Sequence, residues 1–173
     1  MHLNVEIKAQ CANLKKIKEI LESQGAEFKG IDHQIDTYFK VSNGRLKLRE
    51  GKIENNLIFY ERNNEEGPKD SNVVLFSNTP KSNLKDALLG ACGVLVVVDK
   101  KRHIYFIDNV KFHVDEVENL GNFCEIEAID KTNNIGRDKL LQQCQDYMKL
   151  LEIKETDLIS CSYSDLLLQK SIK

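Results

Sequence analysis

The chain has 173 residues, of which 41% are hydrophobic and 30% charged, so it is predicted to form one compact domain over residues 1–173 and not a disordered chain. Its 25 basic and 27 acidic side chains give a formal net charge of −2, so we expect neither nucleic acid nor a membrane as a partner. Apolar runs are too short to span a bilayer and the N-terminus has no apolar signal segment, which makes the cytoplasm the expected location.

The first 25 residues predict a strand followed by a helix. Residues 3–8 alternate between apolar and polar, which is the two-residue period of a strand. From Leu14 to Leu21 the apolar residues recur at helical spacing, and Gly25 stands where a helix C-terminus favours glycine. The fold is therefore expected to begin with one strand and one amphipathic helix.

The middle of the chain is rich in strand patterns. Four strands are predicted, at residues 33–39, 45–49, 57–62 and 71–77. The first two are joined by a hairpin turn that ends at Gly44, and the last two by a polar segment in which Gly67 and Pro68 mark a turn.

The second half adds further strands and helices. A short helix at 82–89, ended by Gly90, should precede strands at 94–106, 110–117 and 123–129 and helices at 140–151 and 163–168. Seven or eight strands with few helical crossovers favour an antiparallel sheet that can close into a barrel. The predicted fold class is therefore α+β.

Charged residues are grouped by strand face, because residues two apart on a strand point the same way. Basic rows comprise Arg45, Lys47 and Arg49, and then Lys100 and Arg102, with Arg62 at the end of another strand. Glu6 shares a face with Lys8, Glu125 with Glu127, and Lys111 with His113 and Asp115.

Two interpretations fit these rows. In one, the sheet is half-buried and its polar face simply meets water. In the other, the sheet closes around a wet interior in which carboxylates bind a divalent cation and basic groups bind phosphate. Spacing alone does not choose between them.

A series of motifs resembles the CYTH superfamily of triphosphate tunnel metalloenzymes, which joins class IV adenylyl cyclases with thiamine triphosphatases. The segment Asn4, Glu6 and Lys8 is similar to the E-x-E-x-K opening motif of that family. Further matching segments follow in the expected order at 33–39, 44–50, 58–62, 67–71, 100–105, 114–127 and 162–167. The resemblance covers nearly the whole chain and is closest to the class IV adenylyl cyclase-like proteins.

The resemblance implies an eight-stranded antiparallel barrel, the triphosphate tunnel, with flanking helices. It assigns Mg²⁺ or Mn²⁺ as the cofactor, with Glu6, Asp115, Glu125 and Glu127 as metal ligands. It assigns catalytic roles to Glu6, Lys8 and Glu127, and phosphate binding to Lys8, Arg45, Lys47, Arg49, Arg62, Lys69, Lys100 and Arg102. Asn4 departs from the motif, which has a glutamate there, so one metal position should be weaker.

Three functions remain open at this stage, all with a small-molecule triphosphate as the partner. The first is a cyclase that converts ATP to cyclic AMP and pyrophosphate. The second is a triphosphatase acting on tripolyphosphate, thiamine triphosphate or a nucleoside triphosphate, and the third is a triphosphate-binding module without turnover. The segments 36–39, 67–69 and 162–167 favour the cyclase by resemblance. The protein is expected to be a monomer or a homodimer.

Overall fold

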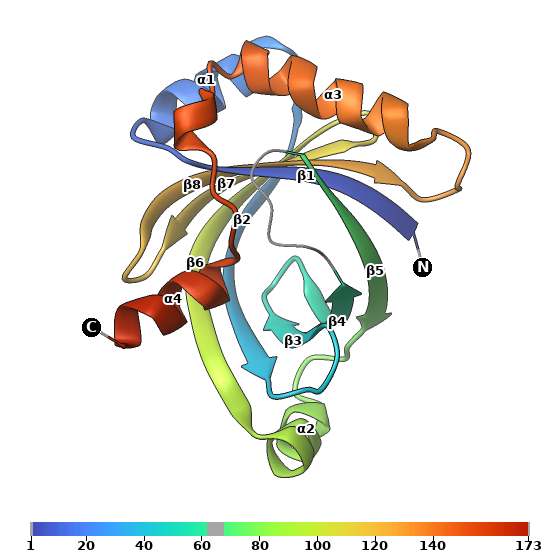
Figure 1. The fold of residues 1–173 in the computed structure, drawn as a ribbon, viewed down its shortest axis with the longest axis vertical. Helices are drawn as coiled ribbons and strands as arrows, with labels where there is room; N and C mark the ends of the chain where they lie inside the picture. The colour runs from blue at the N-terminus through green and yellow to red at the C-terminus, as the bar shows by residue number, and fades with distance from the viewer. Residues whose placement is uncertain (1, 62–67, 173) are drawn as a thin grey trace.

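The computed structural model describes residues 2–61 and 68–172. Within them, eight antiparallel strands form a closed barrel in the order β1-β5-β4-β3-β2-β6-β7-β8 (Figure 1). The strands are β1 His2–Gln10, β2 Glu27–Phe39, β3 Arg45–Glu50, β4 Asn55–Glu61, β5 Lys69–Ser77, β6 Val94–Ile107, β7 Val110–Val117 and β8 Gly121–Asp130. This arrangement confirms the predicted antiparallel barrel.

Helices flank the barrel, as expected for the α+β class. They are α1 Leu14–Ser23, α2 Leu84–Cys92, α3 Arg137–Leu150 and α4 Tyr163–Ser171, with a 3₁₀ turn, η1, at Glu155–Asp157. In the described part of the chain, no helix has the length and apolar character needed to cross a membrane.

Tight turns fix the register of the neighbouring strands. Gly44 (φ +60°) closes the turn between β2 and β3, and Asp108 (φ +50°) lies in the turn between β6 and β7. Glycine and aspartate tolerate these left-handed angles better than most residues. The resulting registers place Asp36 directly opposite Arg49.

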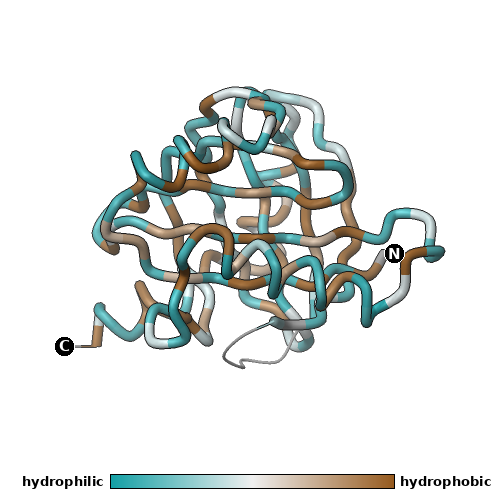
Figure 2. Tube along the Cα trace, turned by 90° about the horizontal axis from the view of Figure 1, so that it is seen from above, coloured by the Kyte–Doolittle hydropathy of each residue, from teal (hydrophilic) through white to brown (hydrophobic). Residues whose placement is uncertain are grey.

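The main apolar core lies outside the barrel, between its wall and two helices. Val5 and Ile7 of β1, Phe112 of β7 and Ile126 of β8 pack with residues of α1 and α3, such as Leu21. Figure 1 shows both helices over this side of the barrel. Along the strands, hydrophobic and hydrophilic residues alternate (Figure 2). Because apolar side chains point out toward the helices, the alternating polar side chains point into the barrel.

The C-terminal helix packs against a second apolar cluster. Leu166 and Leu167 of α4 contact a cluster that includes Tyr38, Phe123 and Tyr163. Ser162 begins the helix with a capping box, in which its Oγ accepts from the Asp165 N–H and its own N–H donates to the Asp165 carboxylate. This cap fixes where Tyr163 enters the barrel.

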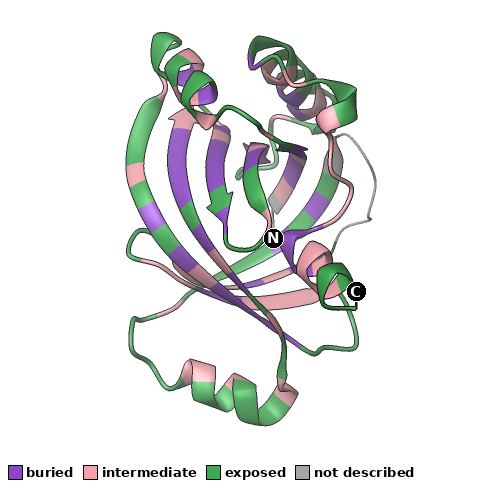
Figure 3. Ribbon diagram, turned by 90° about the vertical axis from the view of Figure 1, so that its left-hand side faces the viewer, coloured by how far each residue is buried: buried purple, intermediate pink, exposed green. Residues whose placement is uncertain are grey.

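Strand β2 and helix α2 both extend beyond the residues predicted for them. Strand β2 begins at Glu27, six residues before the predicted start, and its pairing with β6 is interrupted near Gly30 (φ +131°). Such a bulge breaks the alternation by which strands are found. Helix α2 passes through Gly90 and ends before Gly93 (φ +71°), and it has no buried residue (Figure 3).

Candidate functional site

The barrel encloses a cavity of about 220 Å³. Eight of the residues predicted for the site line it: Glu6, Lys8, Lys47, Arg49, Lys100, Arg102, Glu125 and Glu127. They come from β1, β3, β6 and β8, which are distant in sequence. Barrel closure therefore brings the separate charged rows into one space, as the wet-interior interpretation requires.

The cavity is more basic than the whole chain. Among the described side chains, seven basic residues line it: Lys8, Lys47, Arg49, Lys100, Arg102, Lys111 and Lys131. Five acidic residues accompany them: Glu6, Asp36, Glu54, Glu125 and Glu127. A local surplus of cations in a concave, partly dry site focuses potential that attracts anions.

Asp36 organises three of these cations. Arg49 donates to both of its carboxylate oxygens, from Nε to Oδ1 at 2.8 Å and from Nη2 to Oδ2 at 2.9 Å. Lys100 Nζ lies 2.7 Å and Lys47 Nζ 3.3 Å from Oδ2. Burial would raise the pKa of Asp36, but Arg49, Lys100 and Lys47 hold it well below its usual value. The carboxylate therefore stays ionised and orients the cations.

Asp115 plays a similar part for Arg102. Arg102 donates from Nε to Oδ1 at 2.7 Å and from Nη2 to Oδ2 at 2.5 Å, and the Tyr163 hydroxyl donates to Oδ2 at 2.8 Å. Asp115 is fully buried and does not line the cavity. In this arrangement its carboxylate holds Arg102 in place, and its role as a metal ligand stays a prediction.

Glu125 of β8 joins basic side chains from the nearby strands β1, β6 and β7. Its Oε1 lies 3.2 Å from Lys8 Nζ, while its Oε2 accepts from Arg102 Nη2 at 2.8 Å and contacts His113 Nδ1 at 2.9 Å. Burial would raise the pKa of Glu125, but Lys8, Arg102 and His113 together hold it well below the usual value. Burial, with Arg102 and Lys111, lowers the pKa of His113.

Glu127 and its neighbours form the acidic part of the cavity. The register between β1 and β8 places Glu6 directly opposite Glu127. Asn4 Nδ2 donates to Glu127 Oε1 at 2.5 Å, and Asn4 Oδ1 is buried without a hydrogen-bond partner. An unpartnered buried oxygen beside carboxylates is a donor set that suits a hard divalent cation.

Within residues 2–61 and 68–172, no group of three or more His, Cys, Asp or Glu side chains is gathered closely enough to hold a metal ion. Magnesium sites of nucleotide enzymes commonly use one or two carboxylates and take their other ligands from phosphate and water. Glu127 and Asn4 Oδ1 fit that kind of partial site.

Glu54 is a site residue that sequence reasoning missed. It contacts Lys111 Nζ through Oε1, and Arg49 Nη1 lies 2.7 Å from Oε2. Buried Asp32 holds the segment in place by accepting the backbone N–H groups of Lys52, Ile53 and Glu54 at 2.7–3.1 Å. These contacts join residues about 20 positions apart through a loop, so no strand period could indicate them.

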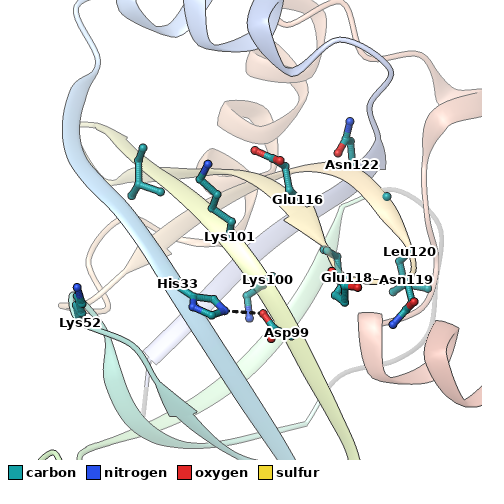
Figure 4. A pocket seen from close by; sticks show the side chains of 13 residues that line it. His33, Lys52, Asp99, Lys100, Lys101, Glu116, Glu118, Asn119, Leu120 and Asn122 are labelled. Atoms are coloured by element: carbon teal, nitrogen blue, oxygen red, sulfur yellow. Dashed lines mark hydrogen bonds and ion pairs between the residues drawn. The ribbon is translucent and has the colours of Figure 1, made fainter.

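A larger cavity of about 840 Å³ lies on the outer wall, across β2, β6 and the turn between β7 and β8 (Figure 4). His33 Nε2 lies 2.7 Å from Asp99 Oδ1 there, beside exposed residues of both signs such as Lys101 and Glu116. Of the described predicted site residues, Lys100 alone lines it. Its charges are spread along an open surface, so we place the site in the smaller interior cavity.

Comparison with known proteins identifies the family. The CYTH domain model matches residues 2–163. The chain belongs to the CYTH domain family. This CYTH domain is 26% identical over 179 residues to "Putative adenylate cyclase MJ0240" of Methanocaldococcus jannaschii, covering 95% of this chain and 98% of that protein.

Solved structures share the fold of this CYTH domain. The PH1012 protein of Pyrococcus horikoshii OT3 is 27% identical with a TM-score of 0.76, covering 96% of this chain and 99% of that chain. The Hippeastrum protein HpAC1, called a "putative adenylyl cyclase" and described with a dominant triphosphatase activity, is 13% identical with a TM-score of 0.63, covering 100% and 97%. These likenesses confirm the predicted family and its tunnel fold.

The remaining predicted residues of this CYTH domain lie elsewhere or are not described. Arg45 is not among the lining residues and donates to Asp165 Oδ2 at 2.8 Å, next to the start of α4. Arg62 lies outside the described residues, so its phosphate-binding role stays a prediction. The backbone of Lys69 pairs with Glu6, but its side chain is not described.

Proposed function

We propose that this chain is a metal-dependent enzyme that binds a triphosphate in the barrel, and that it converts ATP to cyclic AMP and pyrophosphate. The observation that carries the proposal is the meeting of Arg49, Lys100 and Arg102 with Glu127 in one enclosed cavity. Guanidinium and ammonium groups neutralise phosphate oxygens, and a nearby carboxylate suits the accompanying divalent cation.

The size of the interior cavity fits a nucleotide of which only the triphosphate lies inside the barrel. The interior volume of about 220 Å³ is below the about 300–1,000 Å³ of pockets that enclose a whole drug-sized ligand. A second pocket of about 310 Å³ adjoins the interior, since Tyr38 lines both, and Phe39 and Arg45 also line it. A nucleoside extending from the tunnel could occupy this adjoining pocket.

Glu127 and Asn4 Oδ1 are the groups we expect to hold Mg²⁺ or Mn²⁺, with Glu6 opposite Glu127. When bound, the metal neutralises charge on the phosphate oxygens. Glu125 was also expected to be a ligand, but both of its oxygens are already engaged by Lys8, Arg102 and His113.

The cyclase reaction needs positioning more than a strong nucleophile on the protein. The ribose 3′-hydroxyl loses its proton to solvent as its oxygen attacks the α-phosphorus, the bond from that phosphorus to the bridging oxygen breaks, and pyrophosphate leaves. Arg49 and Lys100, both held by Asp36, and Arg102, held by Asp115, are preorganised to receive the charge that develops. Their fixed positions avoid reorganisation during the reaction.

Hydrolysis of a triphosphate is the second candidate. A water molecule would attack the terminal phosphorus, the bond from that phosphorus to the bridging oxygen would break, and orthophosphate and a diphosphate would be released, while the same cations would stabilise the transition state. The dominant triphosphatase activity described for HpAC1, which shares the fold, supports keeping this reaction beside cyclisation.

A product-resolved assay tests both candidates. The chain is incubated with Mg²⁺ or Mn²⁺ and ATP, GTP, thiamine triphosphate or tripolyphosphate. Cyclic AMP with pyrophosphate supports the cyclase, whereas terminal phosphate without cyclic AMP rejects it in favour of the triphosphatase. Tight binding without any product would reject both and leave a binding module.

Glu127→Gln should lower metal-dependent turnover at least about tenfold while leaving the fold intact, because it removes a charged metal ligand from the cavity and not from the core. Glu118→Gln makes the same change at an exposed position on the outer wall and should retain activity. Equal activities in the two variants would show that the Glu127 assignment is wrong.

A further inference from the structure

His113 carries an unexplained buried nitrogen. The residue lines the interior cavity and is only 4% exposed. Its Nδ1 lies 2.9 Å from Glu125 Oε2, whereas its Nε2 is buried without a hydrogen-bond partner. A buried ring nitrogen of this kind needs a partner that the protein chain does not supply.

The contact with Glu125 defines the tautomer. An ionised carboxylate only accepts hydrogen bonds, so Nδ1 carries the hydrogen and Nε2 presents its lone pair. Metal-binding histidines commonly have this arrangement, with one ring nitrogen on the metal and the other donating to a carboxylate behind it. Lys8 and Arg102 occupy the remaining positions on Glu125 and keep it oriented.

The register brings His113 close to the acidic part of the cavity. On β7 and β8, His113 is opposite Glu125 and Lys111 is opposite Glu127. His113 and Glu127 are therefore diagonal neighbours, whose Cβ atoms lie about 7–8 Å apart or less, within reach of one shared ion. Asn4 also lies beside Glu127, to which its Nδ2 donates a hydrogen bond. Its Oδ1, like His113 Nε2, is buried without a hydrogen-bond partner.

We propose that His113 Nε2 is a direct ligand of the divalent metal, together with Glu127 and Asn4 Oδ1, and that Glu125 orients the imidazole from behind. This inference rests on the proposed function in placing the metal inside the tunnel. Phosphate oxygens and water complete the coordination shell. His113 would thereby add a ligand to a site in which Asn4 offers an uncharged oxygen where the family motif has a glutamate.

The proposed ligand set has a consequence for metal choice. Imidazole suits transition metals, whereas Mg²⁺ is bound mostly by oxygen and keeps several waters. The site should therefore prefer Mn²⁺ over Mg²⁺. His113→Gln should weaken Mn²⁺ binding by about tenfold or more and change Mg²⁺ binding less.

Pulsed electron paramagnetic resonance of the full chain loaded with Mn²⁺ tests the inference directly. Wild-type protein should show ¹⁴N coupling from a histidine ligand, and histidine labelled with ¹⁵N should change that coupling accordingly. The coupling should vanish in His113→Gln and persist in His33→Gln, which alters an exposed histidine on the outer wall.

Wild-type protein that binds no Mn²⁺, or binds it through oxygen alone, would overturn the inference, whether or not the variant folds. Persistence of the coupling in folded His113→Gln would do the same. The proposed function is judged separately by product formation. Turnover by a protein whose metal has only oxygen ligands would contradict the proposed histidine ligand but support the proposed enzyme. Nitrogen coupling without turnover would support the histidine ligand but contradict the proposed enzyme.

Discussion

Lys100 Nζ lies 2.7 Å from Asp36 Oδ2, and both residues are only 1% exposed. Burial lowers the pKa of Lys100 to about 7, because Asp36 compensates only in part and Arg49, Arg102 and Lys47 repel a further charge. An unfolded chain keeps this lysine protonated up to about its ordinary value of 10.5. Lys100 therefore lowers the free energy of unfolding below pH 7, and this destabilisation diminishes as the pH rises from 7 toward 10.5.

Tripolyphosphate binding should accordingly take up a proton at alkaline pH. The anion adds negative charge beside Lys100 and raises its pKa, so at pH 8.5 the lysine changes from mostly neutral to charged on binding. Affinity should fall as the pH rises above 7. Calorimetry in two buffers with different ionisation heats should report an uptake approaching one proton per tripolyphosphate.

Lys100→Arg is the control for this proton uptake, because a guanidinium stays protonated throughout the range. The variant should bind without buffer-dependent heat at pH 8.5. Uptake of the same size in both proteins would locate the proton elsewhere and contradict the proposed role of Lys100.

Pairs that face each other across a tight hairpin could be predicted from the sequence. Once Gly44 fixes the turn between β2 and β3, counting along the strands puts Asp36 opposite Arg49. The Asp108 turn does the same for Arg102 and Asp115. The basic rows were recognised, but the carboxylates opposite them were not all given roles: Asp36 counted only as part of a motif segment and was not assigned to the site.

Other parts of the site depend on contacts that no local period reveals. Glu54 reaches the cavity because Asp32, in the part of β2 that was not predicted, binds its loop. Lys8 lies 4.1 Å from the centre of the Tyr163 ring, a contact between the two ends of the chain. Barrel closure and loop attachment are tertiary effects, so the sequence indicated that these charges exist but not that these residues are their partners.

Arg49→Ala should weaken tripolyphosphate binding by roughly 10- to 100-fold, since a hydrogen bond to a charged group contributes about 1.5–3 kcal/mol. Isothermal calorimetry measures the dissociation constant. Arg49→Lys keeps the positive charge but not the pair of parallel N–H donors of the guanidinium, so it should recover only part of the affinity.

A matched control for Arg49 is Arg137→Ala, which disrupts a half-exposed ion pair between Arg137 Nε and Asp70 at 2.7 Å. Because exposed ion pairs contribute little, binding should remain within about twofold of wild type. Circular dichroism establishes that both variants are folded. An Arg49→Ala variant that is folded and binds as wild type would remove Arg49 from the phosphate site.

Asn4→Asp should strengthen metal binding and destabilise the metal-free protein. The new carboxylate would face Glu127 where Asn4 now donates a hydrogen bond, so the two negative charges repel each other until a cation binds. Additional ligand charge should tighten Mn²⁺ binding by about tenfold. Thermal melting with and without Mn²⁺ measures both effects. Compared with wild type, the variant should have a lower Tm without metal and a larger increase in Tm when Mn²⁺ is added.

Asn72→Asp provides the comparison, because it adds the same charge at an exposed position of β5. It should leave the Mn²⁺-dependent change in Tm unaltered. A variant at position 4 that responds to Mn²⁺ no more than the Asn72 variant would place the metal away from Asn4 and Glu127.

Gly51→Ala should destabilise the loop that presents Glu54. A Cβ at Gly51 would lie 2.5 Å from Asp32 Oδ2 and 2.8 Å from Oδ1, closer than Cβ atoms in proteins approach other heavy atoms. Asp32 is fully buried and accepts three backbone N–H groups from this loop, so it cannot yield without losing them. We expect a loss of about 1–3 kcal/mol in the free energy of unfolding.

Gly90→Ala separates this steric effect from the general effect of replacing glycine. Gly90 lies within α2 and a Cβ there would meet no atom within 4 Å, so the substitution should stabilise the protein by about 0.5–1 kcal/mol. In urea denaturation, the midpoints of the two variants should therefore shift in opposite directions.

The Gly51 variant should also bind tripolyphosphate more weakly, since displaced Glu54 no longer orients Arg49 and Lys111. Equal midpoints for both variants would mean that the loop can move away from Asp32, and that the position of Glu54 is not fixed by this contact.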